Sequence, residues 1–143
     1  PRTGHIAIFD RTWYGRVMVE RLEGFCSEND WMRAYNEINE FEKELQDWGA
    51  VLIKFWVQID KETQLARFTD RQNTPEKQWK ITDEDWRNRD KWDQSETAVN
   101  EMIQKTSTIY APWHILESTD KKYARIKALR IVVEELEKVL GCS

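Results

Sequence analysis

Two charged residues follow a short apolar run near the start of the chain and are the first candidates for chemistry. Residues 5–9 have the sequence His-Ile-Ala-Ile-Phe, which is typical of a buried strand, and Asp10 and Arg11 come directly after it. In open parallel sheets, ligands bind beyond the carboxyl ends of the strands. A carboxylate there can hold Mg²⁺ while phosphate oxygens supply the other ligands, and the adjacent arginine can face a phosphate. The alternative is that Asp10 caps the next helix and that Arg11 is solvated.

A basic segment in the middle of the chain is the second candidate. Its seven cationic side chains fall within 25 positions: Arg67, Arg71, Lys77, Lys80, Arg87, Arg89 and Lys91. Guanidinium groups bind phosphate bidentately and ammonium groups act as point charges, so the mixture suits a polyanion. Acidic residues are interleaved with the basic ones, and a run of mixed charge is also typical of a solvated helix face.

A third candidate lies at the start of the last predicted helix. Asp120 and Lys121 follow an apolar run over residues 113–117 that predicts a strand. They should therefore lie on the same edge of the sheet as Asp10, where a nucleotide or phosphate contact is one interpretation. The other is a helix cap followed by an exposed basic face.

The elements that position these residues alternate between strands and helices. Strands are predicted over 5–9, 51–57 and 113–117. Helices are predicted over 13–22, from 31 to 48, over 60–71, from 82 to about 105, and from 120 onward. This alternation predicts an α/β fold with a parallel sheet and right-handed crossovers.

Two helices carry apolar residues at helical spacing. The helix from 31 should be capped by Asn29 or Asp30 and end at Gly49, with one apolar face made of Trp31, Tyr35, Ile38, Phe41, Leu45 and Trp48. The last helix should point a second set inward: Tyr123, Ile126, Leu129, Val133, Leu136 and Leu140.

Composition narrows the class of protein. The 143 residues are 40% hydrophobic and 34% charged, which indicates one globular domain. A net charge of -4 argues against a general nucleic-acid binder, and no apolar run is long enough to span a membrane. The opening residues lack the apolar region of a signal peptide, and the two cysteines form no metal or disulfide pattern, so we expect a cytoplasmic protein. The eight tryptophans are expected to pack in the core and the basic segment.

The order of several motifs resembles the polyphosphate kinase 2 family. Residues 9–16, Phe-Asp-Arg-Thr-Trp-Tyr-Gly-Arg, are similar to its Walker B segment, which commonly has F-D-R-S-W-Y-N/G-R; Thr12 departs from that pattern but keeps the hydroxyl. Further segments match in the same order: 40–42, 52–56, 64–93, 111–113 and 120–125. Gly15 and residues 19–21 and 81–87 are most similar to the fused-domain polyphosphate:AMP phosphotransferases.

This resemblance implies a P-loop kinase-like, three-layer α/β fold that transfers a phosphoryl group between polyphosphate and AMP or ADP. Asp10 would hold Mg²⁺, and Arg11, Arg67 and Arg71 would be the catalytic cations. Residues of about 67–93 would form a lid over polyphosphate. The resemblance assigns substrate binding to Lys77, Lys80, Arg87, Arg89, Lys91, Asp120 and Lys121.

The family also has a glycine-rich phosphate loop upstream of the Walker B strand. The five glycines of this sequence form no G-x-x-x-x-G-K-S/T motif. We therefore expect residues 1–143 to be the C-terminal part of one domain, lacking the first strand, the P-loop and the following helix, and inactive until that segment or a partner chain is supplied. The alternative is a non-catalytic half-domain or interaction module that supports an active partner, and a homo-oligomer stays open.

Overall fold

The computed structural model describes residues 1–141, which form ten helices and strands. Two are 3-10 helices, η1 (Trp13–Val17) and η2 (Pro75–Lys80). The strands are β1 (Lys54–Gln58) and β2 (Trp113–Glu117). The α-helices are α1 (Val19–Leu22), α2 (Glu28–Asp47), α3 (Lys61–Asn73), α4 (Asp83–Asp90), α5 (Trp92–Thr106) and α6 (Lys121–Leu140).

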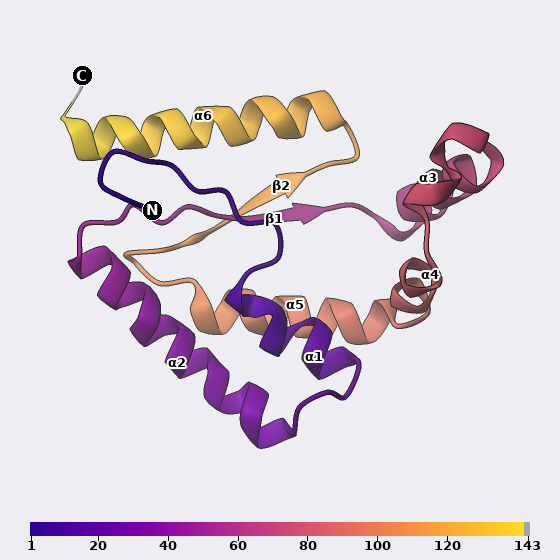
Figure 1. Cartoon of the computed structure of the whole chain (residues 1–143), viewed down its shortest axis with the longest axis horizontal. Coiled ribbons are helices and arrows are strands. Elements are labelled where there is room, and N and C mark those ends of the chain that lie inside the picture. The colour runs from indigo at the N-terminus through magenta and orange to yellow at the C-terminus, as the bar shows by residue number, and fades with distance from the viewer. Residues whose placement is uncertain (142–143) are drawn as a thin grey trace.

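The two strands pair in parallel and form the middle of three layers. Their register runs from Lys54 opposite Trp113 to Gln58 opposite Glu117. Helix α6 lies on one side of the sheet, and η1, α1, α2 and α5 lie on the other (Figure 1). The expected α/β class and the parallel sheet are therefore confirmed.

The prediction of a strand over residues 5–9 is wrong for this structure. The segment passes beside the sheet (Figure 1) but has no strand hydrogen bonding within residues 1–141. Its apolar side chains are exposed, Ile8 to 93%. A strand forms only where a neighbour offers a row of N–H and C=O groups, and the described residues offer none to this segment.

Other boundaries also differ from the predictions. The expected helix from 82 to about 105 is divided into α4 and α5 at Lys91, and the strand expected over 51–57 begins at Lys54. The expected helix over 13–22 is divided into η1 and α1 at Met18. Helix α2 is capped by Ser27 rather than by Asn29 or Asp30, and Asp30 completes the capping box from the third helical position. Gly49 has φ of 104° just beyond the end of α2, a conformation that favours glycine.

The core lies between η1, α2 and α5. Its buried members are Tyr14, Val17, Ala34, Tyr35, Ile38 and Met102. The predicted apolar face of α2 is only partly correct, because Phe41 and Trp48 are exposed while Glu42 is fully buried. Near the end of α2 the buried face of the helix therefore includes the charged residue Glu42 in place of Phe41.

The apolar face of α6 is exposed, against the prediction that it points inward. Tyr123, Ile126, Leu129, Val133 and Leu140 are each more than half exposed, and Leu136 is half-buried. Ala124 is the buried residue of this helix. A sheet of two strands is too narrow to cover a 20-residue helix, so most of the helix face has nothing to pack against.

No helix within residues 1–141 combines the length and the apolar character needed to cross a bilayer.

Met102 gives a direct test of this core, since it is 1% exposed whereas Met32 on α2 is 42% exposed. We expect Met102→Ala to lower the free energy of unfolding by about 2–5 kcal/mol, because it leaves a cavity. Met32→Ala should change it by less than about 0.5 kcal/mol. Urea unfolding of the two variants measures the difference, and equal effects would contradict the assignment of this core.

Candidate functional site

The turn that contains Asp10 and Arg11 has an unusual backbone. Arg11 has φ of 62°, in the left-handed region that non-glycine residues rarely adopt. Thr12 caps η1, and its side-chain oxygen accepts a hydrogen bond of 3.2 Å from the backbone N–H of Tyr14. Asp10 is exposed. Strain of this kind persists only where the surrounding structure enforces it, and it is common at functional sites.

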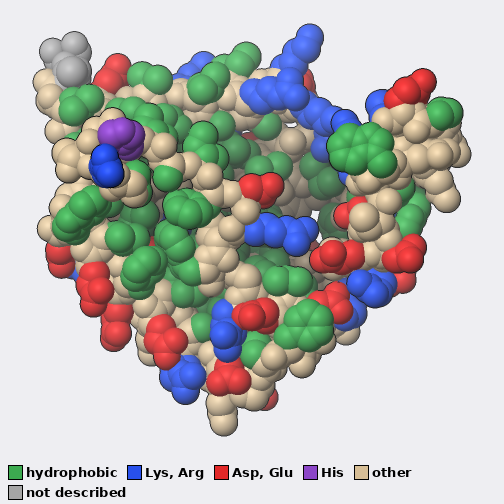
Figure 2. All heavy atoms as spheres, viewed as in Figure 1, with side chains coloured by type: hydrophobic (Ala, Val, Ile, Leu, Met, Phe, Trp, Pro, Cys, Tyr) green, Lys and Arg blue, Asp and Glu red, His purple; other side chains and the backbone are tan. Residues whose placement is uncertain are grey.

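The basic segment forms an arm, residues 61–90, that projects from the body of the protein (Figure 1). Phe68 on α3 and Trp86 on α4 pack with their ring centroids 5.3 Å apart and hold the two helices together. The Thr82–Asp85 capping box starts α4 at the position where the sequence predicts the beginning of a helix. Figure 2 shows the surface hollowed between the arm and the body, with Lys and Arg side chains beside the hollow.

Contacts place the Asp10 turn, the arm and the end of β2 at one edge of the sheet. Arg11 lies 3.9 Å from the carboxylate of Glu84 on α4. Arg67 on α3 donates hydrogen bonds to the backbone oxygens of Ser118 (2.6 Å) and Thr119 (3.2 Å), just after β2. The structure thus brings the first and second candidate groups together, and it also gives Arg67 a role in anchoring the arm.

A cationic cluster lies near Asp70 and consists of Arg71 and Lys77 on the arm and Lys121 at the start of α6. Lys77 donates to the Asp70 carboxylate at 2.9 Å. This hydrogen bond and the charge of Lys77 hold the pKa of Asp70 below its ordinary value, and the charges of Lys121 and Arg71 add to the effect. Lys121, at the start of α6, is therefore close to the arm. One carboxylate among three cations leaves positive charge for an anionic ligand.

The other predicted cations differ in what they contact. Arg89 donates to the backbone oxygen of Lys61 at 2.7 Å and so ties α4 to the start of α3 within the arm. Lys91 donates to the backbone oxygen of Leu22 at 3.0 Å and so fastens the segment between α4 and α5 to α1. Lys80 lies over the ring of Trp79. Across residues 1–141, no side-chain hydrogen bond or ion pair involves Arg71, Arg87 or Lys121.

Asp120 acts as a helix cap in the structure. Its carboxylate accepts hydrogen bonds from the backbone N–H groups of Lys122 (2.9 Å) and Tyr123 (3.2 Å) at the start of α6. Of the two interpretations of this residue, the geometry supports the cap. A direct contact with substrate stays a prediction.

The residues present are compatible with Mg²⁺ only if the substrate supplies most of its ligands. Residues 1–141 contain no cluster of three or more His, Cys, Asp or Glu side chains that could hold a metal. Asp10 offers one exposed carboxylate beside the cationic arm. Magnesium in phosphate-transferring sites is bound by one or two carboxylates together with substrate phosphates and water, and Asp10 fits that part.

Sequence reasoning missed a buried polar network beneath the Asp10 turn. The Nζ atom of Lys54 donates to the carboxylate of Glu42 (2.9 Å), to the hydroxyl of Tyr14 (2.9 Å) and to the backbone oxygen of Thr106 (2.7 Å). The Tyr14 hydroxyl in turn donates to Glu42. Two signals were present: Lys54 interrupts an apolar strand, and Glu42 lies one turn beyond Ile38 on the buried face of α2.

Burial dominates the electrostatics of this network. It raises the pKa of Tyr14, and the hydrogen bond to Glu42 raises it further. Burial lowers the pKa of Lys54, while the Glu42 carboxylate opposes that shift. The hydroxyl of Tyr14 therefore stays protonated and can bridge the two charged groups.

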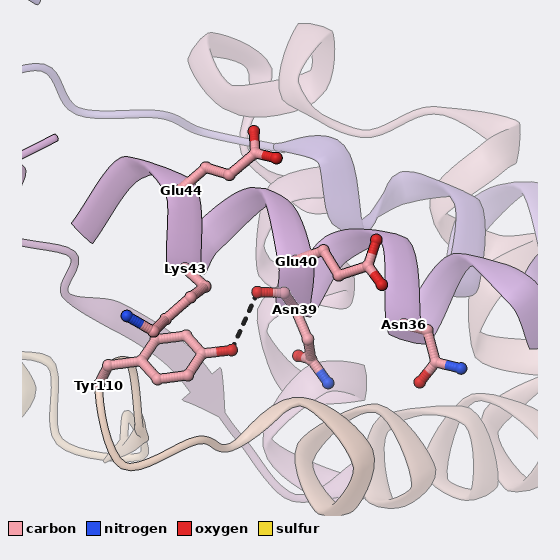
Figure 3. Close-up of a pocket in the computed structure, with 6 residues that line it drawn as sticks. All are labelled: Asn36, Asn39, Glu40, Lys43, Glu44 and Tyr110. Atoms are coloured by element: carbon pink, nitrogen blue, oxygen red, sulfur yellow. Dashed lines mark hydrogen bonds between the residues drawn. The ribbon is translucent and has the colours of Figure 1, made fainter. Parts of the chain in front are cut away.

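A separate depression lies between α2 and the segment that precedes β2 (Figure 3). Its lining residues are Asn36, Asn39, Glu40, Lys43, Glu44 and Tyr110. The Tyr110 hydroxyl donates to the backbone oxygen of Asn39 at 2.9 Å, close to the amino end of β2. Since ligands of parallel sheets bind at the carboxyl ends, this depression is not part of the candidate site.

Comparison with protein families gives one match over almost the whole chain. Residues 1–140 match the family model described as polyphosphate kinase 2.

Relatives and solved structures agree with that match. A polyphosphate:AMP phosphotransferase from Pseudomonas aeruginosa is 55% identical over 96% of this chain, which spans 28% of the relative's length. A crystal structure of a putative polyphosphate kinase 2 from the same species has a TM-score of 0.89 at 54% identity, over 94% of this chain and 29% of the other. The polyphosphate kinase 2 structure from Arthrobacter aurescens has a TM-score of 0.93 at 33% identity, over 97% and 49%.

The buried pair gives a prediction about stability. Glu42 is 0% exposed and the Lys54 side chain 6%, so Glu42→Leu leaves a buried ammonium group without its carboxylate. We expect a loss of about 3–5 kcal/mol in the free energy of unfolding. The double variant Glu42→Leu/Lys54→Met should return to within about 2 kcal/mol of the parent protein. Urea unfolding of the single and double variants measures the coupling, and additive losses would show that the two residues do not act as a pair.

Proposed function

The chain belongs to the polyphosphate kinase 2 family, and we propose that it is the part of a polyphosphate:AMP phosphotransferase domain that positions polyphosphate and Mg²⁺. The observation that carries this proposal is the meeting of the Asp10–Arg11 turn and the cationic arm at one edge of the sheet. The identity of 55% to a protein named polyphosphate:AMP phosphotransferase supports AMP as the acceptor.

The proposed chemistry depends on charge rather than on a covalent nucleophile. Phosphoryl transfer spreads negative charge over the phosphoryl oxygens, so catalysis consists mainly of positioning and electrostatic stabilisation. Magnesium, when bound, would neutralise part of that charge, and Asp10 is the residue of this chain that would hold it. Arg11 and Arg71 would bind phosphate oxygens, while Arg67 would do so only if it left its contacts with Ser118 and Thr119.

The arm has the properties of a lid over polyphosphate. It carries Arg71 and Lys77 near Asp70, and Lys121 at the start of α6 adds a third positive charge to this cluster. When polyphosphate binds, the cations of this cluster would contact its phosphate groups in place of the Asp70 carboxylate. Arg67 would hold the arm to the backbone after β2 during that exchange, while Arg89 and the Phe68–Trp86 pair would keep α3 and α4 together.

The activity also requires a phosphate loop that residues 1–143 do not contain. We infer that a strand-loop-helix unit bearing this loop packs on the exposed apolar surfaces of residues 6–9 and α6. Support comes from the relatives, since this chain spans 28% of one and 49% of another. The chain alone would then be inactive, because the loop's N–H groups and lysine hold the phosphates.

Asp10→Asn tests the proposed metal-holding carboxylate in the domain completed by the phosphate-loop unit, supplied in cis or as a second chain. We expect formation of ADP from AMP, polyphosphate and Mg²⁺ to slow by about 100-fold or more, because charge stabilisation in the transition state is lost. Asp47→Asn, at the end of α2, removes another exposed carboxylate and should leave the rate unchanged.

Two results of this assay would count against the proposal. Full activity of Asp10→Asn would remove Asp10 from the reaction. An unmodified, completed domain that transfers no phosphate to AMP, ADP or GDP would favour the alternative of a non-catalytic half-domain.

Binding of polyphosphate tests the lid. Because cations on the protein release counterions from a polyanion, the affinity should fall steeply with salt. Arg71→Ala should reduce the slope of log affinity against log salt by about 1. Adding Arg67→Ala should bring the reduction to about 2 if Arg67 leaves its contacts with Ser118 and Thr119 to bind phosphate, and should leave it at about 1 if Arg67 stays an attachment. Arg33→Ala, which removes an exposed arginine of α2, is the matched control. An unchanged slope in the Arg71 variant would assign this residue to a solvated helix face.

A further inference from the structure

We propose that Tyr14, Glu42 and Lys54 form a positioning network that fixes the Asp10–Arg11 turn for phosphoryl transfer. The inference rests on the proposed function, and it assigns a role to buried residues that contact neither polyphosphate nor nucleotide in that proposal. It joins two facts about the molecule: a strained turn with an exposed carboxylate, and a fully buried ion pair directly beneath the helix that follows the turn.

The network connects four elements at one point. Tyr14 comes from η1, Glu42 from α2 and Lys54 from the start of β1, and the Thr106 carbonyl ends α5. Lys54 donates to the other three groups at 2.7–2.9 Å, so all three of its N–H bonds are used. This geometry fixes the Tyr14 side chain relative to both the sheet and the helices.

Two sets of hydrogen bonds connect the network to the Asp10–Arg11 turn. Thr12 accepts from the backbone N–H groups of Tyr14 (side-chain oxygen, 3.2 Å) and Gly15 (backbone oxygen, 3.2 Å), one residue beyond Arg11. The indole N–H of Trp13 also donates to Glu42, at 3.2 Å. The side chains of Trp13 and Tyr14 thus both donate to the Glu42 carboxylate, and Thr12, which precedes them, directly follows Arg11. Displacement of this anchor would let Arg11 relax from its left-handed conformation and would move Asp10.

Stability alone does not account for such an arrangement. Replacing a buried ion pair by apolar residues of similar volume is often neutral or stabilising. A directional network instead holds one geometry, and a displacement of about 1 Å at a phosphoryl-transfer site can lower the rate by about 100-fold. The network therefore suits a requirement for position more than a requirement for stability.

Tyr14→Phe is the variant that separates the two requirements. It keeps the ring and leaves Glu42 and Lys54 directly paired at 2.9 Å, so no buried charge loses its partner. In the completed domain, we expect kcat for ADP formation to fall about tenfold, with KM for AMP and polyphosphate changed less than about threefold. Backbone hydrogen exchange, followed by mass spectrometry, should speed up by about tenfold or more in residues 10–18 and stay unchanged in β1 and β2.

Tyr35→Phe is the matched control. Tyr35 lies in the same core and is 3% exposed, and its hydroxyl accepts a hydrogen bond of 3.1 Å from Arg21 rather than from the network. Its loss should leave kcat and the exchange of residues 10–18 unchanged. Trp13→Phe is a second test variant, because it removes the indole N–H that reaches Glu42 and should act in the same direction as Tyr14→Phe with a smaller effect.

The outcomes divide clearly. Faster exchange in residues 10–18 together with a lower kcat supports the proposal. Unchanged exchange in both Tyr14→Phe and Trp13→Phe overturns the claim that the network holds the turn. Faster exchange with an unchanged kcat, or with a change in KM alone, overturns the claim that the network positions the turn for catalysis. If the unmodified, completed domain makes no ADP, the proposed function falls and the catalytic role falls with it, while the exchange pattern still decides whether the network anchors the turn.

Discussion

The ion pair between Glu42 and Lys54 is the interaction on which the rest of the structure depends. A buried ammonium group is tolerated only when it is paired and fully hydrogen-bonded, and here a carboxylate, a hydroxyl and a backbone oxygen meet that requirement. Because these groups come from η1, α2, β1 and the end of α5, the charge is compensated only when all four elements are in place. The pair therefore ties the formation of the core to the position of the turn that carries Asp10.

Charged side chains of the arm and of the start of α6 lie at the edge of the sheet near this network. Arg67 is bound to the backbone after β2 and fixes the base of the arm, while Arg71, Lys77 and Lys121 surround a single carboxylate. The attachment of the arm and the positive charge near Asp70 thus come from different residues. In the proposed transfer of a phosphoryl group from polyphosphate, this division would let the arm bind the substrate while it stays attached to the body.

Exposed apolar side chains of residues 6–9 and α6 mark surfaces that the described residues leave uncovered. Ile6 and Ile8 and the outer face of α6 are in water, although their sequence is typical of buried elements. Apolar surface of this extent usually marks a contact with another segment or chain. The match to structures of polyphosphate kinase 2, of which this chain spans 29% and 49%, is in line with a domain whose other elements cover these faces.

The sequence by itself determined the local features of this protein: the capping box of α4, the Asp120 cap of α6, the limits of β2 and the order of motifs that identifies the family. These depend on side chains a few residues apart, whose hydrogen bonds and spacing are set within one turn or strand. Only the tertiary structure decided that Glu42 is buried while Phe41 is exposed, that residues 5–9 form no strand and that Arg67 binds carbonyl oxygens. Periodicity shows which residues share a face, but the burial of a face, the pairing of a strand and the partner of a charge depend on segments distant in the chain.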